Sequence, residues 1–170
     1  MNLQWHRYSY FPYEKELAVR EVRALLNGAA SSVTESQIRL KGPVDANLAR
    51  RLTYFAAFEG GSEELDTDQA RLERSAGGGK RQATRYSVHG LHDYKGKFNP
   101  QVSRALLNIF ELPKGGIAFD PFCGSGTALV EANHLGLRAY GTDLNPLAVF
   151  VANAKLRALR TPAADLAASC

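Results

Sequence analysis

Hydrophobic and polar positions alternate most regularly between residues 99 and 157. After Asn99-Pro100, apolar residues recur at the three- and four-residue spacing of a buried helix face, and Asn and Pro are favoured at the first positions of a helix. This pattern predicts a helix that ends near Pro113. The short apolar run 117–120 follows a Gly-Gly pair and ends on an acid, which indicates a buried parallel strand.

The same alternation continues to the C-terminal end of this region. Residues 127–135 show a helical pattern closed by Gly136, residues 138–141 form a second strand-like run, and Asn145-Pro146 begins another helix. In that helix we expect Leu147, Phe150, Val151 and Ala154 on one apolar face. Strand, helix, strand and helix in this order predict a βαβα unit of the α/β class.

The first 58 residues carry weaker patterns. Apolar residues at helical spacing predict one helix over 14–26, with Gly28 just beyond its end, and a second between Gly42-Pro43 and Gly60-Gly61. Ile38 and Leu40 alternate with polar neighbours and indicate a short strand between them. We therefore expect four parts, namely a helical N-terminal region (1–58), a charged Gly-rich linker (59–85), an α/β domain (86–160) and a tail (161–170).

Composition narrows the class of protein. The chain has 170 residues, of which 45% are hydrophobic and 22% charged, as in globular proteins. No apolar run approaches the roughly 18 residues of a membrane span, and the N-terminus shows no secretory signal, so we expect a cytoplasmic protein without a membrane partner. Cys123 and Cys170 are too few for a disulfide framework or a zinc site, and His89 and His92 lack further ligands at metal-binding spacing.

Charge is unevenly distributed along the chain. The formal net charge is +4. Residues 59–68 hold five acids and no base, whereas residues 71–97 hold seven bases against Glu73 and Asp93, with Tyr86, Tyr94 and Phe98 among them. Bases interleaved with aromatic rings suit a nucleic-acid backbone with stackable bases, and a solvated linker is the equally weighted alternative.

The segment with the clearest chemistry is the loop Asp120-Pro-Phe-Cys-Gly-Ser-Gly-Thr127, after the first predicted strand. Open α/β sheets bind ligands at such strand ends, and glycines let the backbone approach a ligand closely. A phosphate-binding loop would need Gly-Lys-Ser/Thr, and a dinucleotide-binding loop would need glycine in place of Leu129. Asp143 ends the second strand, where it can accept hydrogen bonds from ribose hydroxyls. A nucleoside without a pyrophosphate fits this pattern best.

At these residues the sequence resembles the S-adenosylmethionine-dependent amino-methyltransferases, especially the DNA methylases that act on adenine N6 or cytosine N4. Three motifs carry the resemblance: the loop 120–127, the segment Gly141-Thr-Asp-Leu-Asn-Pro146, and Tyr94-Lys-Gly-Lys-Phe-Asn-Pro100. The resemblance implies a partial Rossmann-like class I methyltransferase sheet, S-adenosylmethionine as cofactor, and DNA as partner, with RNA as the alternative.

The resemblance also assigns cofactor-binding residues. It implies that the loop of Asp120, Pro121, Phe122, Cys123, Gly124, Ser125, Gly126 and Thr127 holds the methionyl end. Asp143 would bind the ribose, Leu144 would flank the adenine, and Phe98 would lie beside the sulfonium. An ordinary βαβ turn with a chance acid is the alternative for the loop, and a core position is the alternative for Phe98. Cys123 is interpreted as a small filler rather than a nucleophile.

The catalytic motif of this family is missing. The family uses Asp, Asn or Ser followed by Pro-Pro and an aromatic residue to hold the target amine, and this tetrapeptide does not occur in the chain. Two predicted strands also fall short of the family's sheet of about seven. We therefore expect a fragment or a subunit completed by a partner, inactive alone. An RNA guanine-N2 methyltransferase and a non-catalytic binding module remain alternatives.

Overall fold

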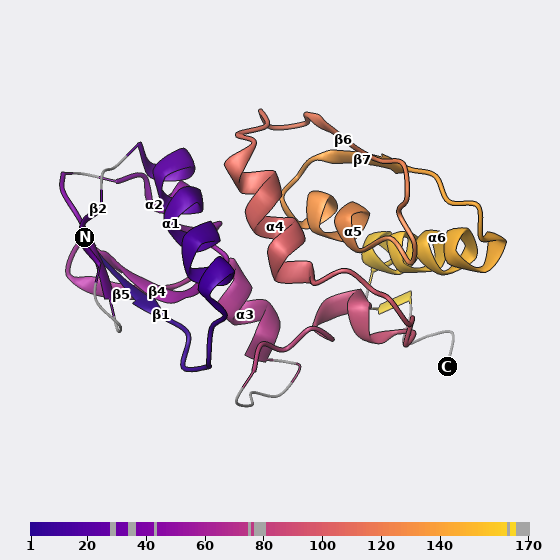
Figure 1. Cartoon of the computed structure of the whole chain (residues 1–170), viewed down its shortest axis with the longest axis horizontal. Helices are drawn as coiled ribbons and strands as arrows, with labels where there is room; N and C mark the ends of the chain where they lie inside the picture. The colour runs from indigo at the N-terminus through magenta and orange to yellow at the C-terminus, as the bar shows by residue number, and fades with distance from the viewer. Residues whose placement is uncertain are drawn as a thin grey trace.

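The fold was analysed in a computed structural model, which describes residues 1–27, 30–33, 37–42, 44–74, 76, 81–162 and 164–165. It has an N-terminal and a C-terminal part, with α4 standing between them (Figure 1). The elements are β1 (Asn2–Trp5), α1 (Pro12–Leu26), β2 (Ala30–Val33), β3 (Gln37–Leu40), α2 (Ala46–Arg50), β4 (Phe55–Gly60), β5 (Glu63–Asp66), α3 (Asp68–Arg74), the 3₁₀ turn η1 (Ser87–Gly90), α4 (Pro100–Ile109), β6 (Ile117–Asp120), α5 (Thr127–His134), β7 (Arg138–Gly141) and α6 (Pro146–Arg160). No helix among these residues is long and apolar enough to span a membrane.

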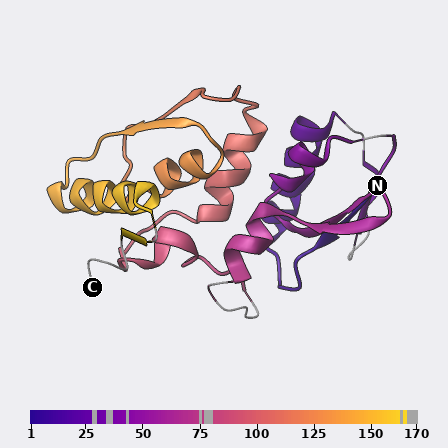
Figure 2. The same cartoon turned by 180° about the vertical axis from the view of Figure 1, so that it is seen from behind.

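The N-terminal part is built on a five-stranded antiparallel sheet in the order β2-β3-β1-β4-β5. Leu3 of β1, Ile38 of β3 and Phe58 of β4 are fully buried, and they join a core that includes Val22 and Leu25 of α1. The view from behind shows the sheet on one side of α1 (Figure 2). Burial of these apolar side chains is the main stabilising contribution in this part of the chain.

The expectation of a helical N-terminal region over 1–58 is therefore wrong, because this region contributes β1, β2, β3 and β4 to a sheet. The predicted helix α1 and the predicted strand β3 are present, but the second predicted helix is reduced to α2, and β4 begins at Phe55. Phe55 satisfies both a helical and a strand pattern, and pairing of β4 with β1 and β5 decides for the strand. Pro43 and Gly28 lie outside the described residues.

The expected linker 59–85 also differs from the structure. Its first half contains β5, which pairs with β4 at the sheet edge, and α3, which packs near β4. The acidic side chains of Glu63 and Glu64 lie on this edge strand and are exposed, so they need no buried partner. The triple glycine 77–79 lies outside the described residues.

In the C-terminal part, the predicted helices α4, α5 and α6 and the predicted strands β6 and β7 are all present. The two strands are parallel, with Ile117 opposite Arg138 and Asp120 opposite Gly141, and α5 connects them. Asn99 caps α4 and Asn145 caps α6 through their side-chain oxygens. The expected burial of β6 is wrong, because Phe119 is 63% exposed in this two-stranded sheet.

A buried carboxylate joins the two parts. Glu21 of α1 is fully buried and accepts hydrogen bonds from the backbone N–H and the hydroxyl of Thr53, at 3.1 and 2.6 Å, and from Nδ2 of Asn108 on α4, at 2.7 Å. Burial raises the pKa of Glu21, although these donors oppose the rise. An acceptor-only group thus meets donors from the N-terminal part and from α4, which fixes α1 against α4.

We expect Glu21→Gln to lower the free energy of unfolding by about 1–3 kcal/mol, because its amide nitrogen would face donors in a buried site. The measurement is urea unfolding followed by circular dichroism. Glu16→Gln is the matched control on the same helix: Glu16 is exposed and forms a surface ion pair with Arg20, so its loss should stay within about 0.5 kcal/mol. Equal stability of the two variants would contradict the bridging role of Glu21.

Candidate cofactor-binding site

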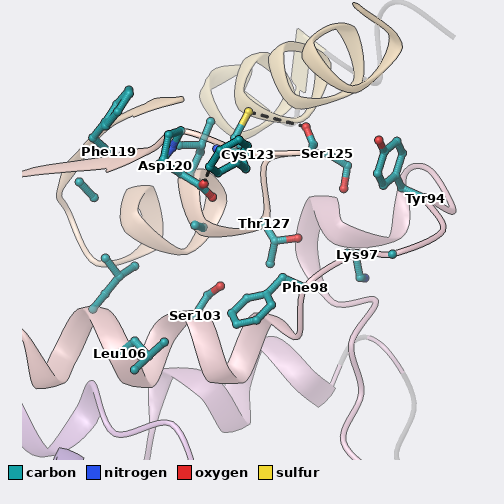
Figure 3. A pocket seen from close by; sticks show the side chains of 18 of the residues that line it. Tyr94, Lys97, Phe98, Ser103, Leu106, Phe119, Asp120, Cys123, Ser125 and Thr127 are labelled. Atoms are coloured by element: carbon teal, nitrogen blue, oxygen red, sulfur yellow. Dashed lines mark hydrogen bonds between the residues drawn. The ribbon is translucent and has the colours of Figure 1, made fainter. Parts of the chain in front are cut away.

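A cavity with a volume of about 500 Å³ opens beside the carboxyl end of β6. It lies between α4, the loop after β6, the start of α5 and the segment that leads into α4 (Figure 3). Its lining residues are Tyr94, Gly96, Lys97, Phe98, Ser103, Leu106, Leu107, Phe110, Ala118, Phe119, Asp120, Pro121, Phe122, Cys123, Gly124, Ser125, Thr127, Ala128 and Leu129. A mostly apolar cavity with a few polar groups is typical of small-molecule sites.

Eight of the eleven residues expected to bind a cofactor line this cavity, namely Phe98, Asp120, Pro121, Phe122, Cys123, Gly124, Ser125 and Thr127. The other three are Gly126, Asp143 and Leu144. Gly126 is the N-cap residue of α5, and Leu144 is fully exposed. Residues from two distant segments of the sequence therefore meet at one cavity.

The loop after β6 is held by backbone hydrogen bonds to the end of β7. The N–H of Cys123 donates to the carbonyl of Thr142 at 2.9 Å, and the N–H of Thr142 donates to the carbonyl of Asp120 at 3.1 Å. The Asp120 carboxylate accepts from the N–H of Phe122 at 3.0 Å. These bonds extend the pairing of the two strands into the loop.

Two glycines allow this loop to pack closely. Gly126 has a φ of +79°, and a Cβ placed there would come within 2.8 Å of Cβ of Ala152 on α6. A Cβ on Gly141 of β7 would come within 2.7 Å of Cβ of Cys123. Both distances are too short for real side chains, so the sequence needs glycine at these positions for steric reasons.

Asp143 does not line the cavity but supports its loop. One carboxylate oxygen accepts from the N–H of Gly124 at 2.9 Å, and the other accepts from the N–H of Asn145 at 2.8 Å. The side chain therefore ties the loop after β6 to the start of α6. Each carboxylate oxygen can accept a further hydrogen bond, so these contacts leave capacity for a ligand.

A second buried carboxylate holds the segment that leads to Phe98. Glu131 of α5 is fully buried and accepts from the hydroxyl of Tyr86 at 2.9 Å, lies 2.6 Å from Nε2 of His89, and accepts from Nη1 of Arg104 at 3.3 Å. Burial alone would raise the pKa of Glu131, but the bond to His89 and the charge of Arg104 outweigh it, and the pKa is lowered. His89 is thus one of the partners of the buried Glu131 carboxylate.

Cys123 lies under the loop with only 7% of its surface exposed. Burial raises the pKa of its thiol, and the carboxylates of Asp120 and Asp143 raise it further. The thiolate is the nucleophilic form of cysteine, so this environment disfavours nucleophilic chemistry. Its contact distance to Gly141 is consistent with the interpretation as a small filler.

The cavity includes residues that sequence reasoning missed. Ser103, Leu106, Leu107 and Phe110 of α4 form one wall, and Phe119 of β6 extends it. The helical pattern of α4 indicated an apolar face, but it could not show that part of this face lines a cavity rather than a core. Phe119 belongs to the apolar run 117–120, and this run by itself could not show that the ring is exposed beside the cavity.

This cavity lies at the end of a parallel strand, beside a loop that contains glycines and near an acid that follows the next strand. The family model described as "UPF0020: RMKL-like, methyltransferase domain" matches residues 90–168. This match supports the family expected from the three motifs, and relatives of this class imply S-adenosylmethionine as methyl donor.

The relatives include DNA methyltransferases and, separately, tRNA methyltransferases. The chain is 43% identical over 70 residues to the Type II methyltransferase M.MjaII of Methanocaldococcus jannaschii, which covers 41% of this chain and 13% of that protein. It is 39% identical over 74 residues to the Type II methyltransferase M.MvaI of Kocuria varians, and the match covers 42% of this chain and 16% of that protein. A tRNA (guanine(10)-N2)-dimethyltransferase of Methanothermobacter thermautotrophicus is 36% identical over 52 residues, and the match covers 31% of this chain and 16% of that protein. The matched part is thus a small share of each relative's length.

The steric role of Gly126 can be tested against Gly136. Both have a positive φ, but a Cβ on Gly136 would meet no atom within 4 Å. We expect Gly136→Ala to cost about 1–2 kcal/mol of unfolding free energy from the left-handed backbone alone, and Gly126→Ala to cost about 1–3 kcal/mol more because it collides with α6. Thermal unfolding of both variants measures the difference. Equal losses would show that the close packing on Ala152 is not a constraint.

Proposed function

We propose that residues 86–160 are the cofactor-binding portion of a site-specific DNA methyltransferase that modifies an exocyclic base amine, adenine N6 or cytosine N4. The strand and helix arrangement around β6 and β7 would be part of a Rossmann-like class I methyltransferase sheet. The observation that carries the proposal is the cavity at the end of β6, where the predicted loop and Phe98 meet. The DNA methyltransferases among the relatives favour DNA.

In this proposal the methionyl end of S-adenosylmethionine binds along the loop from Asp120 to Thr127. Asp143 accepts hydrogen bonds from the ribose, and Leu144 flanks the adenine. Phe98 closes the cavity beside the sulfonium, where its ring can contact a cationic group. The apolar wall of α4 excludes water from the cofactor. Bound there, S-adenosylmethionine would supply the methyl group that is transferred.

Transfer needs a target base that has left its stack and an acceptor for its amine hydrogens. The Asp/Asn/Ser-Pro-Pro-aromatic tetrapeptide that does this in the family is absent from the 170 residues. We therefore propose that the base-binding residues are supplied from outside this sequence, by further chain or by a complementary subunit. These 170 residues by themselves would bind cofactor without transferring methyl groups.

RNA is the second candidate substrate, and a specific observation favours it. Several relatives are tRNA guanine-N2 methyltransferases, from Methanothermobacter thermautotrophicus, Methanocaldococcus jannaschii and Saccharomyces cerevisiae among others. DNA amino-methylation and RNA guanine-N2 methylation both transfer a methyl group to an exocyclic amine. The cofactor cavity serves either reaction, because substrate selection depends on residues that contact the base.

The cofactor proposal is tested by calorimetry with S-adenosylmethionine. We expect the wild-type protein to bind it and Asp143→Ala to weaken binding roughly tenfold or more, because a charged hydrogen-bond acceptor is lost. Gly136→Ala serves as control for general loss of stability, since its site faces open space away from the cavity. No binding by the wild-type protein would sink the proposal and favour a non-catalytic binding module.

Catalysis is tested by transfer of a radiolabelled methyl group to DNA oligonucleotides and to unmodified tRNA. We expect no transfer by the 170-residue protein. When a polypeptide that carries the Pro-Pro-aromatic motif is added, transfer should appear on one substrate and identify it. Methylation by the 170 residues alone would overturn the proposed need for outside residues.

A further inference from the structure

The N-terminal part has a cavity of its own, outside the residues 90–168 that the family model matches. Its volume is about 660 Å³. It is lined by the segment that follows β1, by β4, by the end of β5, by α3 and by the segment after α3. The motifs of the cofactor site leave this N-terminal cavity without a role, so its own chemistry must indicate what it binds.

The charged side chains of the N-terminal cavity are three arginines, Arg7, Arg74 and Arg81, and two acids, Asp66 and Glu73. Arg74 forms an ion pair with Asp66, whereas Arg7 is exposed and forms no ion pair with a carboxylate among the described residues. Burial raises the pKa of Glu73, which disfavours its negative charge. The lining therefore carries a surplus of positive charge, which favours an anionic ligand.

Aromatic rings lie beside these cations in two stacked pairs. The rings of His6 and Tyr8, which both line the cavity, have centroids 5.1 Å apart and an interplanar angle of 10°. The rings of Phe11 and Tyr13 stack at 5.7 Å and 15°, and each of these residues is about half exposed. The guanidinium carbon of Arg81 lies 3.9 Å from the centroid of the Phe11 ring and thus connects the cavity to the second pair. Exposed rings beside arginines are a surface on which unpaired bases can stack.

Arg81 is held in this place and still has donors to offer. Its Nη1 donates to the carbonyl of Ser9 at 3.1 Å, and its Nη2 lies 3.8 Å from Oε1 of the buried Glu14. The Arg81 side chain is nevertheless 45% exposed. A guanidinium group carries five N–H donors in a planar fork, so these contacts leave donors for a phosphate group.

The open face of the N-terminal sheet is less suited to an anionic ligand than the cavity. The N–H of Asn2 donates to Oε2 of Glu59 at 3.0 Å, and Nε2 of Gln4 donates to Oε2 of Glu64 at 2.6 Å. Hydrogen bonds from Asn2 lower the pKa of Glu59, which favours its charged form. Exposed carboxylates repel a phosphate backbone, so the cavity side of this part is the side that favours a nucleic acid.

A line of lining residues connects the N-terminal cavity to the cofactor cavity. Ala83 lines the N-terminal cavity, and the next two residues, Thr84 and Arg85, line a smaller hollow of about 300 Å³. Tyr94 and Lys97 line both this hollow and the cofactor cavity. The segment 81–98 runs from the end of α3 toward the C-terminal part (Figure 1). A strand bound at the N-terminal cavity can therefore continue along this segment to the cofactor cavity.

We infer that the N-terminal cavity and the stacked pair of Phe11 and Tyr13 bind a single-stranded segment of the nucleic-acid substrate. Its bases stack on the exposed rings, and its phosphates accept hydrogen bonds from Arg7 and Arg81. Unpaired bases are required because a duplex keeps the faces of its bases inside the stack. This inference rests on the proposed function for the identity of the partner as a nucleic acid, and it gives the N-terminal part a role in binding that partner.

The test is fluorescence anisotropy with a labelled single strand of about 12 nucleotides, offered as DNA and as RNA, and with duplex DNA. We expect the wild-type protein to bind the better single strand at least roughly fivefold more tightly than the duplex, and the tighter of DNA and RNA identifies the source of the strand. Tyr13→Ala should weaken single-strand binding roughly fivefold or more without changing its salt dependence, because a stacking contact is lost. Arg7→Gln and Arg81→Gln should each lower the slope of log affinity against log salt by about 0.7, because one phosphate contact is lost.

Two matched controls should bind the single strand as the wild type does. Arg23→Gln removes an exposed arginine at the other end of α1, and Phe150→Ala removes an exposed ring on α6. Circular dichroism reports whether each variant is folded. Equal losses in Arg7→Gln and Arg23→Gln would overturn the assigned location.

The ligands separate this inference from the proposed function. Equal affinity for single strand and duplex, or equally strong competition by poly-glutamate, would overturn the recognition of unpaired bases. A wild-type protein that binds S-adenosylmethionine but no single strand would refute this inference and leave the proposed cofactor site standing. A wild-type protein that binds the single strand but not S-adenosylmethionine would support the N-terminal site and refute the proposed cofactor site instead.

Discussion

The site depends on how closely the loop between β6 and α5 can pack against β7 and α6. At Gly126 and Gly141 the neighbouring backbone or side chain leaves no room for a Cβ, and at Asp143 one carboxylate holds both the loop and the start of α6. A loop of this kind would otherwise be free to move, because its backbone groups lack regular partners. Close packing converts it into a rigid rim for the cavity, which reduces the ordering that a ligand would have to impose.

Two buried carboxylates extend this rigidity across the molecule. Glu21 ties α1 to α4, and Glu131 ties α5 to α4 and to the turn η1. Each is an acceptor-only group surrounded by donors, so these hydrogen bonds compensate for the free-energy cost of removing the carboxylate from water. Since α4 forms one wall of the cavity, the N-terminal part supports the site without contributing a lining residue among those described.

Four of the seven bases in the stretch 71–97 have partners within the described part of the protein. Arg74 pairs with Asp66, Arg85 pairs with Asp93, and Lys97 donates to a backbone carbonyl. Arg81 lies over the ring of Phe11 at 3.9 Å. Paired charges contribute less to binding a phosphate backbone than free ones, so the support for a nucleic-acid partner comes from the relatives more than from this stretch.

Local signals in the sequence determined the C-terminal elements and most of the candidate site. The caps Asn99 and Asn145 act within one turn of their own helices, and the loop residues 120–127 are contiguous, so the sequence alone could reveal them. Only the tertiary structure decided that Phe55 begins a strand, that Phe119 is exposed and that Lys155 is buried beneath Ser125. Strand pairing and burial depend on partners distant in the sequence, whereas helix caps and turns depend on neighbours, and that physical difference separates what could be predicted from what could not.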